Sequence, residues 1–139
     1  MDKPRVLFLC THNSCRSQMA EGFLRHLAGD RFEAASAGSQ ATRVNLDAAR
    51  VMMEIGIDIS EHRSKDVSEL LGQRFTYVVR VCDRAKETCP IFPGAFRYFD
   101  WGLDDPAAAQ GTDDERLAVF RRVRGEIERK VEEFVAKEA

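Results

Sequence analysis

Hydrophobic residues along this chain fall into short continuous runs that alternate with longer stretches of helical spacing. The run VLFLC at residues 6–10 is apolar throughout, which is typical of a strand buried on both faces of a parallel sheet. FTYVVRVC at 75–82 mixes β-branched and aromatic residues and predicts another strand. FEAASAG at 32–38 and AFRYF at 95–99 are two further candidates, so the pattern predicts four strands.

Other stretches repeat apolar residues at intervals of three and four, as the buried stripe of a helix does. Such spacing predicts helices over 17–29 and 45–55, and a short helix over 66–71. The TDDE capping box at residue 112 begins a long helix whose apolar stripe reaches Phe134. Strands that alternate with helices predict a small α/β domain, a four-stranded parallel sheet flanked by helices in three layers.

Composition limits the size and the partners of this domain. With 139 residues, 44% of them hydrophobic, we expect one domain over 1–139, monomeric by default. Charged residues make up 32% but nearly cancel at a net charge of −2, which disfavours nucleic acid as a partner. The five-residue apolar run after MDKPR is too short for a signal peptide or a membrane span, so we expect a cytoplasmic protein with no membrane partner.

The chain has four cysteines, Cys10, Cys15, Cys82 and Cys89. In a reducing compartment permanent disulfides are rare, so such thiols tend to be catalytic, redox-active or metal-bound. A structural zinc site usually has close cysteine pairs, and the C-x4-C and C-x6-C spacings here fit it poorly. We therefore expect no metal.

The stretch CTHNSCRS joins the first predicted strand to the first predicted helix. In such a turn several backbone N–H groups point toward the positive end of the helix, which predicts a cradle for an oxyanion. Arg16 can hold two oxygens of a tetrahedral anion, and its charge favours the thiolate of Cys10. The oxyanion-binding residues predicted are Thr11, His12, Asn13, Ser14, Cys15, Arg16 and Ser17. The non-functional alternative is that Cys10 is a buried small residue and Arg16 a surface cation.

Within the loop several roles stay open. Asn13 can tie the turn together and Ser17 can donate to the Cys10 thiolate, but both residue types are also ordinary helix caps. His12 is expected to be a surface residue, because a thiolate beside Arg16 needs no separate base. Cys15 is expected to be auxiliary or simply packed.

CTHNSCRS resembles the C-x5-R-S loop of the low-molecular-weight protein tyrosine phosphatases and of the thioredoxin-coupled arsenate reductases that share their fold. GIDISEHRSK, VCDRAKETCP and WGLDDPA are similar to the reductase branch, so the resemblance covers nearly the whole chain. It implies that Asp105 is the general acid and that Cys10, Cys82 and Cys89 are the three redox cysteines. From the sequence alone, Asp105 could equally be a turn residue before Pro106.

The resemblance implies reduction of arsenate to arsenite, in which Cys82 and then Cys89 resolve the adduct and thioredoxin restores the thiols. Phosphate or sulfate should also fit the loop, and weak phosphatase activity should follow. The alternative is a phosphatase that hydrolyses monoesters through a Cys10 phosphocysteine, although AAA after Pro106 gives an aryl ring little to pack on. A phosphocarrier would share the cradle but would not need Asp105 or the cysteine pair.

Some reductases of this family hold potassium beside the loop. Asn13, Glu21 and Ser36 match that pattern, whereas Arg63 and Lys65 put cations where oxygen ligands are expected. We therefore expect no cofactor, with the hypothesis that the Lys65 ammonium replaces the ion.

Overall fold

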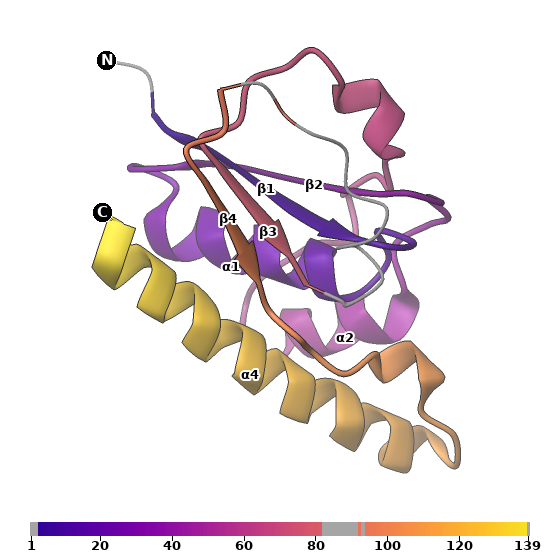
Figure 1. The fold of residues 1–139 in the computed structure, drawn as a ribbon. Coiled ribbons are helices and arrows are strands. Elements are labelled where there is room, and N and C mark those ends of the chain that lie inside the picture. Colours follow the sequence, from indigo (N-terminus) through magenta and orange to yellow (C-terminus); the bar gives the residue numbers. More distant parts are fainter. Residues whose placement is uncertain (1–2, 82–91, 93, 139) are drawn as a thin grey trace.

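The computed structural model describes residues 3–81, 92 and 94–138 of the chain. These residues form a four-stranded, wholly parallel sheet in the order β2-β1-β3-β4 (Figure 1). The strands are β1 Arg5–Cys10, β2 Glu33–Gly38, β3 Tyr77–Arg80 and β4 Arg97–Asp100. The predicted α/β fold with a four-stranded parallel sheet is confirmed.

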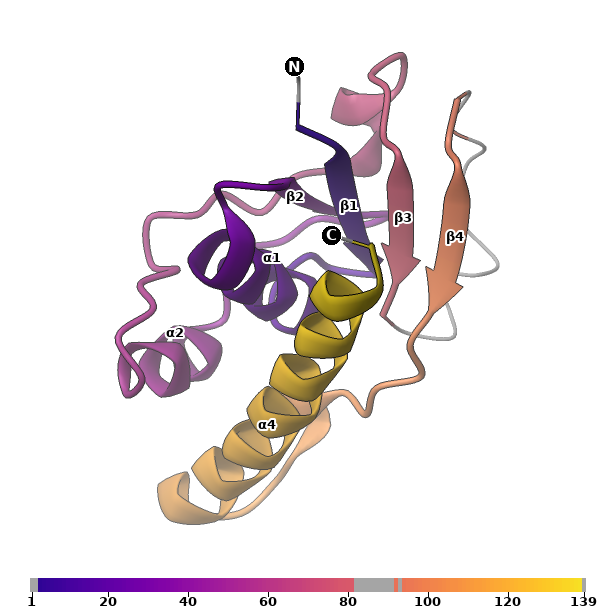
Figure 2. The same ribbon diagram turned by 90° about the vertical axis from the view of Figure 1, so that its left-hand side faces the viewer.

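Three α-helices lie on the same side of this sheet and pack against one another (Figures 1 and 2). They are α1 Arg16–Ala28, α2 Leu46–Met53 and α4 Asp113–Glu138. Two short 3-10 helices, η1 Val67–Leu70 and η2 Pro106–Ala108, complete the described elements. The helix predicted at 66–71 is therefore a single 3-10 turn, which begins with a capping box between Asp66 and Glu69.

Two predicted strands are shorter than their hydrophobic runs. Pairing of β3 with β1 covers only Tyr77 to Arg80, although the Val81 N–H still donates to the Leu9 carbonyl at 2.9 Å. At the start of β4, Phe96 turns its N–H toward the carbonyl of Thr76, and its side chain is exposed. The apolar run before β3 extends past the ladder because Phe75 is buried in the core, whereas Phe96 before β4 lies at the surface.

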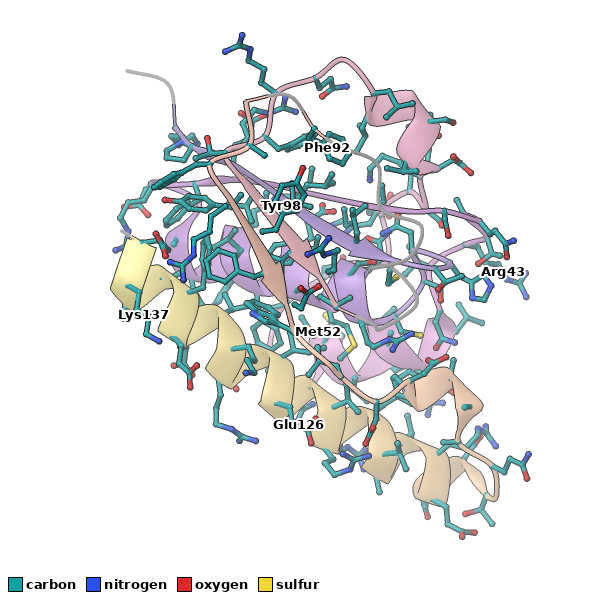
Figure 3. All side chains as sticks on the ribbon, viewed as in Figure 1. Arg43, Met52, Phe92, Tyr98, Glu126 and Lys137 are labelled. Carbon is teal, nitrogen blue, oxygen red and sulfur yellow. The ribbon has the colours of Figure 1, made fainter. Side chains whose placement is uncertain are left out.

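Aromatic contacts fix α4 against the sheet. The Phe134 ring lies 5.3 Å from Phe32, 5.2 Å from Tyr77 and 5.5 Å from Phe99, all between ring centroids. Aromatic pairs at these separations contribute beyond the area that they bury. Figure 3 shows the side chains that lie between α4 and the strands.

An ion-pair cluster joins α2 to α4. Glu54, at the end of α2, accepts from Arg121 at 2.7 Å and from Arg124 at 2.8 Å. Arg124 also donates to the Val51 carbonyl at 2.7 Å. Hydrogen bonds from both guanidinium groups lower the pKa of Glu54 to about 2.

Candidate active site

The site lies at the carboxyl ends of the strands, where ligands bind in open parallel sheets. Cys10, the last residue of β1, pairs with Gly38, the last residue of β2. Residues 11–15 then lead directly into α1. The predicted placement of the thiol between a buried strand and a helix is confirmed.

The carbonyl groups of this loop all point outward, each to a donor elsewhere in the chain. The bonds are Gln40 N to Thr11 O (2.8 Å), Thr42 N to His12 O (3.1 Å), Gln18 Nε2 to Asn13 O (3.2 Å), Asn45 N to Ser14 O (2.9 Å) and Met19 N to Cys15 O (2.8 Å). Because the N–H of a planar trans peptide points opposite to its carbonyl, the N–H groups of residues 12–16 face the inside of the loop. This is the geometry of an oxyanion cradle.

Two backbone features allow the loop to close tightly. A Cβ atom on Gly38 would lie 2.5 Å from the Thr11 carbonyl oxygen and 2.8 Å from the Asn13 nitrogen, so no larger residue fits there. Asn13 has a φ of 50°, in the left-handed region that asparagine tolerates better than most residues. No role was predicted for Gly38. The signal for it in the sequence is a glycine at the end of the predicted strand 32–38.

The sulfur of Cys10 is buried among donors. It lies 2.8 Å from the Ser17 hydroxyl and 3.2 Å from the Asn13 N–H, which donates to it. The side-chain amide of Asn13 in turn donates to the Ser17 oxygen at 2.8 Å. Neither Asn13 nor Ser17 caps α1 with its side chain. The structure therefore favours a role in supporting the Cys10 thiol over ordinary helix capping.

The first turn of α1 is open toward the loop. Cys15 occupies its N-cap position without a side-chain hydrogen bond to the helix, and the first turn has no acidic residue. The unpaired N–H groups and the helix dipole therefore favour an anion at this end. Burial raises the pKa of the Cys15 thiol to about 12, so Cys15 stays protonated and is no second nucleophile.

Arg16 and Asp105 meet at the edge of the loop. The guanidinium of Arg16 donates to the Leu103 carbonyl at 2.9 Å and lies 3.8 Å from the Asp105 carboxylate. Asp105 also accepts from the Ala107 N–H at 3.0 Å and so starts η2. The structure is therefore compatible with Asp105 as a general acid and as a turn residue, because the turn that it begins lies beside the anion site. Its role as an acid stays a prediction.

The other predicted residues are placed as follows. Thr11 is buried, Ser14 is partly buried, and His12 is exposed at the surface, as expected of a residue without a role as base. Cys82 and Cys89 lie outside the described residues. The last described residue before them, Val81, is hydrogen-bonded to Leu9, the neighbour of Cys10.

Of the three side chains that match the potassium pattern, Asn13 and Glu21 accept from donors of the protein itself, and Ser36 is one of those donors. Asn13 Oδ1 accepts from the Lys65 N–H at 2.8 Å and from Gln18 at 2.9 Å. Glu21 accepts from the Ser36 hydroxyl and pairs with Arg25 at 2.8 Å. These residues do not fit a bound cation. The cation on Glu21 is Arg25 and not Lys65, whose ammonium donates to the Arg63 carbonyl, so the hypothesis about Lys65 was wrong.

No cluster of three or more metal-binding side chains occurs among residues 3–81, 92 and 94–138. Within the same residues, no helix combines the length and the apolar character that a membrane span requires.

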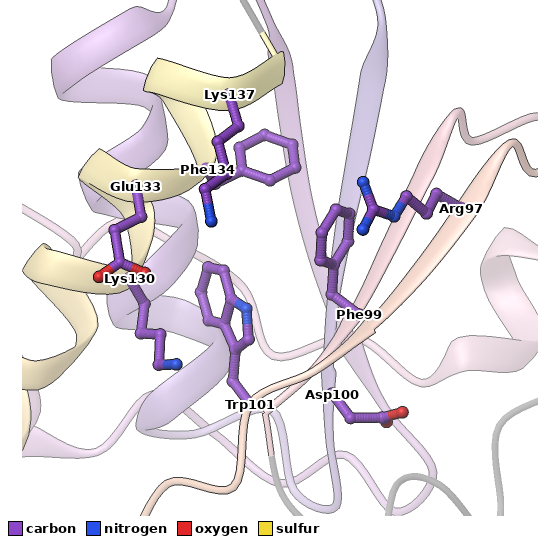
Figure 4. Close-up of a pocket in the computed structure, with 8 residues that line it drawn as sticks. All are labelled: Arg97, Phe99, Asp100, Trp101, Lys130, Glu133, Phe134 and Lys137. Carbon is purple, nitrogen blue, oxygen red and sulfur yellow. The ribbon is translucent and has the colours of Figure 1, made fainter.

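One cavity lies beside the loop, and another lies between β4 and α4. One, of about 280 Å³, borders the outer side of the loop and is lined by Ser14, Thr42, Arg43, Asn45 and Leu46. The other, also about 280 Å³, lies between β4 and α4, where Lys130 and Trp101 face each other (Figure 4). No loop residue lines this second cavity, so it is separate from the candidate site.

Comparison with known proteins places this geometry in a family. Residues 5–138 match the family described as low molecular weight phosphotyrosine protein phosphatase. The arsenate reductase of Halalkalibacterium halodurans is 48% identical over 134 residues, 96% of each chain, and that of Bacillus subtilis is 43% identical over 96% of each chain.

Solved structures agree with this assignment. One described as an arsenate reductase in the phosphate binding state has a TM-score of 0.80 and 34% identity, covering 98% of this chain and 99% of that one. The thioredoxin-dependent arsenate reductase of Corynebacterium glutamicum has a TM-score of 0.70 and 30% identity, covering 98% of this chain and 64% of that one. This chain belongs to the low molecular weight phosphotyrosine protein phosphatase family, and within it resembles the arsenate reductases.

Proposed function

We propose that this protein is a thioredoxin-dependent arsenate reductase that converts arsenate to arsenite. The observation that carries the proposal is the Cys10 sulfur at the base of a loop whose N–H groups face inward. A tetrahedral oxyanion held by those groups presents its central atom to the sulfur. The similarity to arsenate reductases over 96% of the chain supports arsenate as the substrate.

The first step is a displacement at arsenic. The Cys10 thiolate forms a sulfur–arsenic bond, and one arsenic–oxygen bond breaks. The departing group is a hydroxyl of arsenate, which takes one proton and leaves as water. Asp105 is the proposed donor, since it lies beside Arg16 at the edge of the loop.

The second step reduces the arsenic. The thiolate of Cys82 attacks the sulfur of Cys10, and the electron pair of the sulfur–arsenic bond stays on arsenic, which leaves as arsenite. Two thiols become the Cys10–Cys82 disulfide, which balances the change from arsenic(V) to arsenic(III). Cys89 then attacks Cys82, and thioredoxin reduces the resulting Cys82–Cys89 disulfide. In support, the chain continues to Cys82 directly from Val81, which follows β3 and is hydrogen-bonded to Leu9 of β1.

Phosphatase activity is the second candidate, because the same cradle fits phosphate. One observation favours it as a weak side reaction: the residues after Asp105 are Pro106 and alanines that form η2, which offers no aromatic wall for a phosphotyrosine ring. Hydrolysis of aryl phosphates should therefore be slow.

The test is arsenate-dependent NADPH oxidation with thioredoxin and thioredoxin reductase. We expect turnover in the native protein, none in Cys82→Ser or Cys89→Ser, and near-native turnover in the matched control Cys15→Ser. If the native protein does not turn over arsenate, while all three variants keep aryl phosphate hydrolysis, the protein is a phosphatase and the proposal is wrong.

A further inference from the structure

A chain of five hydrogen bonds links the surface of α1 to the sulfur of Cys10. Its bonds are Arg25 Nη1 to His62 Nε2 (3.0 Å), His62 Nδ1 to Gln18 Oε1 (3.0 Å), Gln18 Nε2 to Asn13 Oδ1 (2.9 Å), Asn13 Nδ2 to Ser17 Oγ (2.8 Å) and Ser17 Oγ to Cys10 Sγ (2.8 Å). Asn13, Ser17 and Gln18 are completely buried, so little solvent weakens these bonds.

The direction of the inner bonds follows from one backbone group. The Lys65 N–H, which can only donate, lies 2.8 Å from the Asn13 side chain, so the atom that it contacts is the amide oxygen. The Asn13 amide nitrogen must then face Ser17 and donate to its oxygen. The Ser17 hydroxyl hydrogen is left to point at the Cys10 sulfur.

The direction of the outer bonds follows in the same way. Asn13 Oδ1 needs a donor from Gln18, so the Gln18 oxygen faces His62. His62 must carry its proton on Nδ1 to donate there, which leaves Nε2 as the acceptor for Arg25. A guanidinium cannot accept a hydrogen bond, so Arg25 is a donor. In each of the five hydrogen bonds the donor therefore lies on the Arg25 side and the acceptor on the Cys10 side.

The state of His62 fits this order. Burial of the ring lowers the pKa of His62. The charge of Glu21 opposes this shift, and the charge of Arg25 adds to it. A neutral ring is the form that can accept from Arg25 and donate to Gln18 at once. Arg25 is itself held by Glu21 at 2.8 Å and by the Ala34 carbonyl at 3.0 Å.

We infer that Arg25 and His62 are positioning residues for the nucleophile of the proposed reductase. Arg25 holds His62 in one tautomer, and this tautomer keeps the Gln18 and Asn13 amides turned so that Ser17 donates to Cys10. Hydrogen bonds in a row polarise one another, and a fixed positive charge at the far end favours negative charge on the sulfur. Without Arg25, the other tautomer of His62 would turn the Gln18 oxygen toward the Asn13 oxygen and weaken the chain.

The test measures the thiol directly and needs no arsenate. In a Cys82→Ser, Cys89→Ser background, iodoacetamide alkylation of Cys10 at neutral pH should be about fivefold slower in Arg25→Ala, the order of effect of one weakened hydrogen bond to a charged group. Arg25→Lys, which keeps a cationic donor, should recover most of the rate. Arg31→Ala removes a positive charge from an exposed residue that is not part of the hydrogen-bond chain, and it should leave the alkylation rate unchanged.

Two further measurements separate positioning from general loss of structure. Nitrogen NMR shifts should report the Nδ1-protonated form of His62 in the native protein and a mixture of tautomers in Arg25→Ala. His62→Ala should slow alkylation as Arg25→Ala does, and a double variant should add little. Native alkylation rates in Arg25→Ala, or equal slowing in Arg31→Ala, would overturn the inference. Slow alkylation in a protein that never reduces arsenate would refute only the proposed function.

Discussion

Arg16 and Asp105 lie 3.8 Å apart across the edge of the loop, although 89 residues separate them in the sequence. The same guanidinium holds the Leu103 carbonyl, so the segment that carries Asp105 is tied to the start of α1. The carboxylate is thus kept near the position where a leaving oxygen would need a proton.

Asp105→Asn should lower arsenate turnover about 100-fold, the usual contribution of a positioned acid. The amide can still accept from the Ala107 N–H, so the turn should survive. Steady-state turnover with saturating thioredoxin is the measurement. Asp104→Asn is the matched control, because Asp104 is exposed and pairs with Arg122. Equal losses in both variants would remove Asp105 from the mechanism.

Gly38→Ala should distort the backbone of the oxyanion cradle. The new methyl group would press on the Thr11 carbonyl and the Asn13 nitrogen, at a cost of about 1–3 kcal/mol in the free energy of unfolding. Phosphate binding, followed by calorimetry, should be lost or strongly weakened.

Gly125→Ala is the control for this substitution. Gly125 lies within α4, and its Cβ would meet only the Arg129 side chain at 3.7 Å. Alanine should therefore stabilise the helix by up to about 1 kcal/mol and leave phosphate binding intact. Normal phosphate binding by Gly38→Ala would show that the loop tolerates the contact.

Cys15 should resist alkylation in the folded protein, since burial raises the pKa of its thiol to about 12. Because the folded thiol holds its proton more tightly than the unfolded one, stability is unaffected below about pH 9.0, the ordinary value, and falls as the pH rises from 9.0 toward about 12. Mass spectrometry after brief alkylation near neutral pH should find Cys10 modified and Cys15 free. Rapid labelling of Cys15 would contradict the burial that the structure shows.

Glu54→Gln should destabilise the protein in a pH-dependent way. The pKa of Glu54 is lowered to about 2 by Arg121 and Arg124, so its contribution is present above the ordinary value of 4.5 and is lost as the pH falls toward 2. Urea unfolding should show the largest difference between native and variant proteins near neutral pH. A difference that stays constant down to about pH 2 would show that the charge of Glu54 is not its source.

Replacement of potassium by sodium at constant ionic strength should leave both arsenate turnover and Cys10 alkylation unchanged. The Asn13 oxygen already accepts from Gln18 and the Lys65 N–H, and the Glu21 carboxylate from Arg25 and Ser36. A potassium-dependent rise in either rate would mean that these bonds open to admit the ion.

The strand run at 6–10 and the helix that follows were predictable because each depends on local spacing, and the C-x5-R-S loop was predictable because it joins them. The contact of His62 with Gln18 was not, because 44 residues separate them and no periodicity relates them. The hypothesis that the Lys65 ammonium replaces a potassium ion was wrong for a similar reason. Helical geometry places the i,i+4 neighbour, Arg25, on Glu21, whereas the Lys65 ammonium donates to the Arg63 carbonyl.

The outward bonds of the loop carbonyls have a consequence for how such a site can vary among related chains. Three of the donors are backbone N–H groups of residues 40–45, which any residue except proline supplies. Side chains in that connection can therefore change with little effect, but its length cannot. An insertion or deletion of one residue between β2 and α2 would move the donors out of register, and the inner surface of the loop would lose its shape although no loop residue had changed.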